Sequence, residues 1–159
     1  MTSKTYLLDS NIFMEASRTY YRFHIVPTFW DVIIDGHNDN TLYSIDKVKE
    51  EIKAGNDDLA TWVSDTLPDE FFNSIVDMDV ITEYQKMVQW VDSSTQFTQA
   101  AKAKFSSNAD GWLVAYAKAH DYVVVTREVY VADIKREVKI PNVSEEFDVE
   151  YIDTFDLLE

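Results

Sequence analysis

Three short apolar runs along the chain predict β-strands, and a stretch with helical spacing follows each of the first two. The first two runs are TYLL (5–8) and TLYS (41–44). The third, YVVVT (122–126), is the strongest candidate because β-branched residues favour extended backbone. Strand and helix therefore alternate along the chain.

Helical patterns fill most of the remaining sequence. A short helix is expected over 12–20, and Pro27 opens a second one that ends near Gly36. Apolar residues at helical spacing predict a third helix over 45–52. The long stretch 57–105 is helical throughout in this interpretation, with Asp57 and Asp69 as helix caps.

The last third of the chain completes the expected architecture. Residues 109–120 are apolar nearly all round, which predicts a central helix. The tail segments VKIPNV (138–143) and VEYI (149–152) predict a peripheral strand or two, and 154–159 a final helical turn. Strands separated by helices predict a mainly parallel sheet with helices on both faces, in a single domain over 1–159.

Composition narrows the chemistry. The chain has no cysteine, so a metal would be held by oxygen or imidazole ligands, which favours hard cations. No apolar run is long enough for a membrane span, and the N-terminus lacks the features of a signal peptide, so a cytoplasmic location is expected. The net charge of −15 argues against nucleic-acid binding unless divalent cations reverse the field locally.

Acidic residues lie at the ends of predicted elements or within them at four places along the chain, which we call the four acidic stations. Each has an ordinary explanation when taken singly: a helix cap, a solvated helix face or a surface loop. Their joint order along the chain is the informative feature. The stations are Asp9 after the first strand, the pair Glu50 and Glu51, Asp110 at the start of the central helix, and Glu128 after the third strand.

These motifs resemble those of PIN domains. YLLDSN, KVKEEI, ADGWLVAYAKAH and VVVTRE follow the order and approximate spacing of the PIN acidic motifs. The segment EASRTYYRFHIVPTFW, the long helical middle and the VKIPNV tail resemble, more narrowly, a prokaryotic PIN-like family of largely uncharacterised proteins related to VapC-type toxins. The resemblance covers almost the whole chain.

The resemblance implies a fold and a function. The fold would be a three-layer α/β/α sandwich around a mainly parallel sheet, with an enlarged helical middle region. The function would be that of a divalent-metal-dependent endoribonuclease using Mg²⁺ or Mn²⁺, the toxin of a type II toxin–antitoxin pair. Such a protein acts on RNA and has an antitoxin partner. The apolar helices in the middle also allow a homodimer.

Site roles follow from the resemblance one residue at a time. Asp9 would be the central metal ligand, and Asn11 would orient it or bind the scissile phosphate. Glu51 is the preferred glutamate because it precedes an aliphatic residue, as the family's glutamate does, with Glu50 as the alternative. Asp110 would be the third ligand, stabilised by its position in the first turn of a helix.

The fourth station departs from the family's usual aspartate. Glu128 stands there, which favours one tightly held metal and a carboxylate that acts through water. Thr126 could contact phosphate or hold a ligand through its hydroxyl. Arg18, near tyrosines, is a candidate RNA contact. Lys102, Lys104 and Arg127 are weaker candidates for a basic rim that binds RNA, because the chain has only 14 basic residues against 29 acidic ones.

Two other functions compete with the nuclease. An aspartate after the first strand also begins haloacid-dehalogenase-type phosphatases, but the acid needed two residues later is Asn11 here. The stronger alternative is a non-catalytic module that keeps the fold and acts through protein contacts, as the acidic surface and the altered fourth station would suit.

Overall fold

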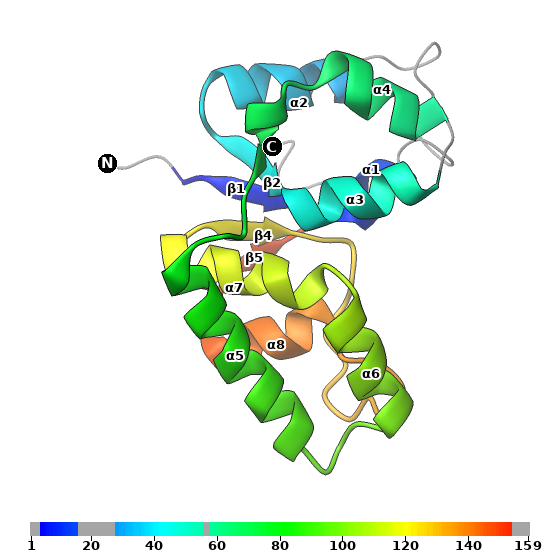
Figure 1. Cartoon of the computed structure of the whole chain (residues 1–159), viewed down its shortest axis with the longest axis vertical. Helices are drawn as coiled ribbons and strands as arrows, with labels where there is room; N and C mark the ends of the chain where they lie inside the picture. Colours follow the sequence, from blue (N-terminus) through cyan, green and yellow to red (C-terminus); the bar gives the residue numbers. More distant parts are fainter. Residues whose placement is uncertain (1–3, 16–27, 56–57, 154–159) are drawn as a thin grey trace.

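A five-stranded parallel sheet forms the middle of the part of the chain that the structure describes (Figure 1). The computed structural model describes residues 4–15, 28–55 and 58–153. The sheet order is β3-β2-β1-β4-β5, and all four pairings are parallel. The strands are β1 (Tyr6–Leu8), β2 (Leu42–Ile45), β3 (Phe72–Asn73), β4 (Val123–Val125) and β5 (Tyr151–Ile152).

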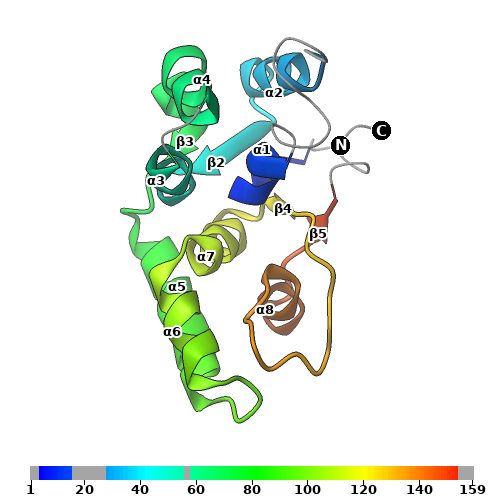
Figure 2. The same ribbon diagram turned by 90° about the vertical axis from the view of Figure 1, so that its right-hand side faces the viewer.

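Helices cover both faces of this sheet. One layer contains α1 to α4 and the other contains α5 to α8, and Figures 1 and 2 show the two layers on opposite sides of the strands. The expected three-layer α/β/α architecture with a parallel sheet is therefore confirmed. The helices are α1 (Ser10–Glu15), α2 (Thr28–Asn38), α3 (Asp46–Ala54), α4 (Asp58–Thr66), α5 (Met78–Ser93), α6 (Gln99–Ser107), α7 (Asp110–His120) and α8 (Ile140–Phe147), with a short 3₁₀ helix, η2 (Asp69–Phe71).

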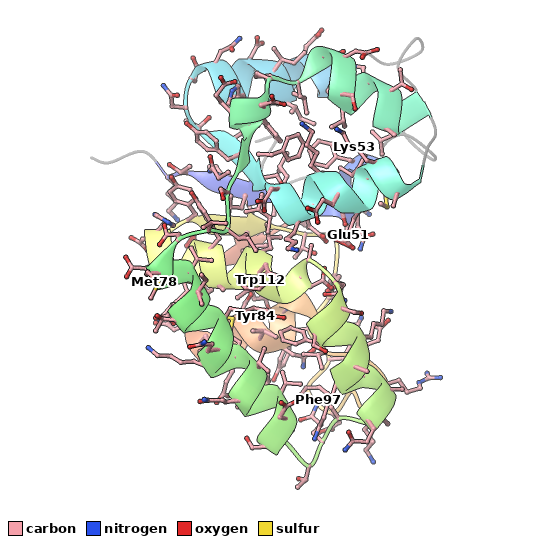
Figure 3. All side chains as sticks on the ribbon, in the orientation of Figure 1. Glu51, Lys53, Met78, Tyr84, Phe97 and Trp112 are labelled. Carbon is pink, nitrogen blue, oxygen red and sulfur yellow. The ribbon has the colours of Figure 1, made fainter. Side chains whose placement is uncertain are left out.

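The centre of the core lies where α7 packs under β1 and β4. Leu8, Val125 and Leu113 have no exposed surface there. On the outer side of α7, Trp112 stacks on Tyr84 of α5 with ring centroids 3.6 Å apart (Figure 3). The helix that is apolar nearly all round is thus enclosed by strands on one side and helices on the other, as its sequence predicts.

Two expectations for the secondary structure were wrong. Residues 138–143 do not form a strand, because α8 begins at Ile140 and Pro141 lies in its first turn, where a missing N–H costs nothing. The stretch 57–105 is not helical throughout, since β3 interrupts it and pairs with β2 at the edge of the sheet.

The caps expected in that stretch also differ. Pro68, not Asp69, is the cap residue of η2, and Asp77 caps α5 by accepting hydrogen bonds from the backbone of Asp79 and Val80. Asp57 and the predicted turn at 154–159 lie outside the described residues. None of the described helices is long and apolar enough to span a lipid bilayer.

Candidate metal centre

The carboxyl ends of β1 and β4 bring Asp9 and Thr126 together. Leu8 and Val125 are register partners in the two parallel strands, so the residues that follow them are neighbours. The Asp9 N–H donates to the Val125 carbonyl at 3.1 Å, and the Thr126 Oγ1 hydroxyl donates to Asp9 Oδ2 at 3.1 Å. Both side chains are only 1% exposed. Asp9 is therefore held in one orientation at the edge of the sheet.

Asp110 enters from the start of α7. It is the first residue of the helix after Ala109, and its N–H donates to Asn108 Oδ1 at 3.0 Å. The next residue, Gly111, allows α7 to approach its neighbours closely, because a Cβ there would lie 2.6 Å from Phe105 Cζ. The free N–H groups of a helix start favour a carboxylate at this position.

Glu51 enters from α3 in the opposite layer (Figure 3). Its side chain is partly buried, and its Oε1 atom is enclosed without a hydrogen-bond partner. The neighbouring Glu50 is exposed and lies 3.7 Å from Lys47 in an ion pair. Of the two glutamates that the sequence leaves open, Glu51 alone has a buried, unsatisfied oxygen.

Glu128 is fixed by two backbone contacts. Its own N–H donates to Thr126 Oγ1 at 3.2 Å, and its Oε2 accepts the N–H of Ile140 at 2.9 Å. The residue before Ile140 in the chain is Lys139, whose side chain makes no cap hydrogen bond, so Glu128 takes the place of a capping side chain for α8. The longer carboxylate at the fourth station thus joins the site to a helix of the outer layer.

Burial and neighbouring carboxylate charges raise the pKa of both aspartates in the cluster. Burial, and then the charges of Glu128 and Glu51, raise the pKa of Asp9 to about 7, while the Thr126 hydrogen bond opposes the rise. Burial and the charges of Asp9, Glu128 and Glu51 raise the pKa of Asp110 to about 8. Burial also raises the pKa of Glu51 and of Glu128. The four groups therefore form one electrostatic cluster.

This donor set suits a hard divalent cation. A cation would neutralise the repulsion between Asp9 and Asp110 and give the buried Oε1 of Glu51 a partner. In the described part of the chain, no three acidic or histidine side chains lie close enough to hold an ion as they stand. Mg²⁺ usually binds through one or two carboxylates and keeps several waters, so it does not need three carboxylates in direct contact.

The remaining predicted site residues differ in their surroundings. Asn11 is exposed near the start of α1, beside Asp9. The Thr126 hydroxyl already donates to Asp9, which is one of the two uses expected for it. Arg18 lies outside the described residues.

Sequence reasoning did not single out Lys139, which borders the cluster together with Lys104. Both line a small hollow of about 30 Å³ beside Asp110 and Glu128. The sequence signal for Lys139 was its place in a basic stretch, KREVK (135–139), but the sequence analysis assigned Lys139 to the predicted strand VKIPNV (138–143).

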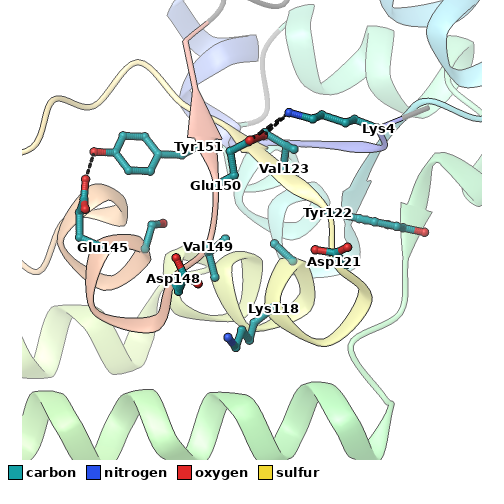
Figure 4. A pocket seen from close by; sticks show the side chains of 12 residues that line it. Lys4, Lys118, Asp121, Tyr122, Val123, Glu145, Asp148, Val149, Glu150 and Tyr151 are labelled. Atoms are coloured by element: carbon teal, nitrogen blue, oxygen red, sulfur yellow. Dashed lines mark hydrogen bonds and ion pairs between the residues drawn. The ribbon is translucent and has the colours of Figure 1, made fainter. Parts of the chain in front are cut away.

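A larger hollow lies at the other edge of the sheet. It measures about 850 Å³, and Lys4, Tyr122 and Glu150, which line it, precede β1, β4 and β5 (Figure 4). Lys4 and Glu150 form an ion pair at 2.9 Å there. The carboxylate cluster lies after the carboxyl ends of the strands. The large hollow and the buried charges are therefore at opposite edges of the sheet. We take the cluster as the candidate site because only there do buried charges converge.

Two solved structures share this fold. FitAcB from Neisseria gonorrhoeae aligns with a TM-score of 0.58 and 18% identity over 93% of this chain and 96% of that chain. VapBC2 from Rickettsia felis, solved bound to a DNA fragment from their promoter, aligns with a TM-score of 0.56 and 14% identity over 94% of this chain and 98% of that chain. The PIN-like fold inferred from the sequence is confirmed by these likenesses.

Comparison of the sequence with curated proteins finds no match. A family model does match, over residues 6–159, which is nearly the whole chain. The chain therefore belongs to the family described as "Domain of unknown function (DUF4411)".

Proposed function

We propose that this chain is a divalent-metal-dependent endoribonuclease that acts as a single PIN-like domain over residues 1–159. The observation that carries the proposal is the cluster of Asp9, Glu51, Asp110 and Glu128 at the carboxyl edge of a parallel sheet. Sites in open parallel α/β sheets form outside the carboxyl ends of the strands. Buried like charges are costly, and such clusters are typical of functional sites.

Asp9, Glu51 and Asp110 would hold Mg²⁺ or Mn²⁺. The ion, when bound, would lower the pKa of a bound water and stabilise negative charge on the phosphate. The chain's own residues supply orientation: Thr126 fixes Asp9, and Ala109 and Asn108 set the start of α7 that carries Asp110. Glu128 would act on this site through water, and Asn11 and Arg18 are proposed contacts to the RNA.

A partner protein is part of the proposal. An intracellular ribonuclease harms its host unless its site is blocked, and two structures with this fold are FitAcB and VapBC2. We therefore propose an antitoxin with a basic segment that matches the net charge of −15. A cytoplasmic location goes with an RNA substrate. A homodimer is also proposed, since Val76 and Met78 are 84% and 76% exposed at the start of α5.

Cleavage of RNA by the purified protein tests the nuclease. Wild type should cut RNA with Mg²⁺ or Mn²⁺ and lose the activity in EDTA. Asp9→Asn and Asp110→Asn should abolish cleavage, whereas Asp65→Asn, a change at an exposed position on α4, should leave it intact. Metal-dependent cleavage that persists in both site variants would contradict the assignment.

One observation favours the non-catalytic alternative. Glu128 uses Oε2 to hold the start of α8, so the fourth carboxylate has a structural contact that competes with metal chemistry. If no RNA or DNA is cut under any metal condition while a partner protein co-purifies, the protein is a binding module.

A further inference from the structure

Basic residues gather beside the carboxylate cluster although the chain as a whole is strongly acidic. Residues 96–109 contain two lysines and no acidic residue, against a net charge of −15 for the chain. Residues 135–139, the last part of the loop from β4 to α8, add three more basic residues beside one acidic residue, Glu137. We call these five residues the basic margin: Lys102 and Lys104 on α6, and Lys135, Arg136 and Lys139 in the loop.

The loop is hydrogen-bonded to residues just before α6, and Figure 1 shows it running beside that helix. Gln96 Nε2 donates to the carbonyls of Ala132 and Ile134 at 2.8 and 2.7 Å. The Thr98 N–H donates to the Lys135 carbonyl at 2.9 Å. These hydrogen bonds hold the loop next to the helix, and none of them involves a charged side chain.

Lys104 and Lys139 are the members of the basic margin that reach the cluster. Both line the hollow of about 30 Å³ that Asp110 and Glu128 also line. That volume is about the share of one water molecule, so the hollow holds no nucleotide itself but marks where cations border the carboxylates. Lys104 is 67% exposed and lies 3.8 Å from Glu137, which is 46% exposed. Its ammonium group is therefore available to a ligand that displaces Glu137.

We propose that Lys104 and Lys139 bind backbone phosphates of single-stranded RNA next to the scissile bond, and that Glu137 competes with RNA for Lys104. This inference rests on the proposed nuclease function. RNA is a polyanion, so it can approach four carboxylates only if positive charges lie next to them. Lysine supplies such a charge and binds phosphate as a point charge.

Binding of a fluorescein-labelled single-stranded RNA of mixed sequence tests the proposal. Anisotropy would be measured at several salt concentrations in Ca²⁺, which oxygen ligands also bind. Lys104→Gln and Lys139→Gln should each weaken binding roughly 3- to 10-fold and reduce the slope of log affinity against log salt by about one. Glu137→Gln should tighten binding. The control Lys86→Gln, at an exposed lysine on α5, should change neither.

The proposal is overturned if wild type does not bind the RNA, if both lysine variants bind like wild type, or if Lys86→Gln loses as much affinity. Binding of polyglutamate instead of RNA, with the same lysine dependence, would assign the margin to an acidic protein and also overturn it. Metal-dependent cleavage with unchanged KM in both lysine variants would sink this inference alone. Lysine-dependent RNA binding without any cleavage would contradict the nuclease proposal and the placement of these lysines beside a scissile bond, and would leave only an RNA-binding surface.

Discussion

At the scale of single residues, the hydroxyl of Thr126 decides how Asp9 is presented. It donates to Asp9 Oδ2 and accepts the N–H of Glu128, so one oxygen orients two carboxylates of the cluster. Removal of a side chain that hydrogen-bonds to a metal ligand typically weakens metal binding 10- to 100-fold, on the order of 1 to 3 kcal/mol. Thr126 is therefore a positioning residue in the proposed site.

Two substitutions of Thr126 distinguish the effect of its hydroxyl from the effect of its side-chain volume. Thr126→Val keeps the volume but leaves the buried Asp9 oxygen without its donor, so Mn²⁺ affinity should fall roughly 10- to 100-fold. Thr126→Ser keeps the hydroxyl and should stay within a few-fold of wild type. Isothermal titration of both variants with Mn²⁺ measures the difference. Equal affinity in the two variants would remove Thr126 from the account.

At the scale of elements, Glu128 connects the sheet edge to α8. The side chain accepts the N–H of Ile140, in the way that a capping residue satisfies the first turn of a helix. The departure from aspartate at the fourth station thus has a structural reason in this chain. A shorter aspartate would have to reach the same N–H with one methylene less.

Removal of this capping contact should destabilise the protein. Glu128→Ala should have a free energy of unfolding about 0.5 to 2 kcal/mol lower than Glu128→Gln, as loss of a helix cap does. Both variants remove the charge that repels Asp9 and Asp110, and only Gln keeps an acceptor for the Ile140 N–H. Urea denaturation in EDTA measures both. Glu146→Ala, at an exposed position in α8, is the matched control. Equal stability of Glu128→Ala and Glu128→Gln would show that the contact contributes nothing.

Elements with a strong local pattern could be predicted from the sequence. The valine run of β4 and the all-apolar α7 were placed correctly because burial on both sides leaves a continuous apolar signal. The two-residue strand β3 could not be predicted, since it exists only by pairing with β2. The start of α8 was mistaken for a strand because VKIPNV has β-prone residues, and its helix is stabilised by the distant Glu128.

The same limit applies to the candidate site. The order of acidic residues indicated which carboxylates to examine, and the choice of Glu51 over Glu50 followed a family pattern; the geometry adds a buried oxygen at Glu51. The proximity of Lys104 and Lys139 to Asp110 could not be predicted. It depends on backbone hydrogen bonds between a loop and α6 that have no sequence signature.

At the scale of the whole molecule, the proposed metal and the fold stabilise each other. Burial raises the pKa of Asp9 to about 7 and that of Asp110 to about 8, both above the value of 3.8 for a free aspartate. A group whose pKa is raised in the folded state adds stability that is full below the unfolded pKa and is lost as pH rises through the folded pKa. The metal-free protein should therefore lose stability progressively from about pH 4 to about pH 8.

Thermal denaturation in EDTA tests this prediction. The Tm of wild type should fall from about pH 5 to about pH 8 and level off above it, and Mn²⁺ should restore it most at the high end, where both carboxylates are ionised. Asp110→Asn should show a weaker pH dependence and a smaller gain from Mn²⁺. A Tm in EDTA that does not change across this range, or rises, would contradict the predicted repulsion within the cluster.

The central claim is that carboxylates from both layers of the fold meet in one divalent-metal site. Titration of wild type with Mn²⁺, beside Glu51→Gln and Glu50→Gln, tests it most directly, because the two glutamates are adjacent and differ in which way they face. We expect one tightly bound Mn²⁺ in wild type and in Glu50→Gln, and much weaker binding in Glu51→Gln. No Mn²⁺ binding in wild type, or equal binding in all three proteins, would contradict it.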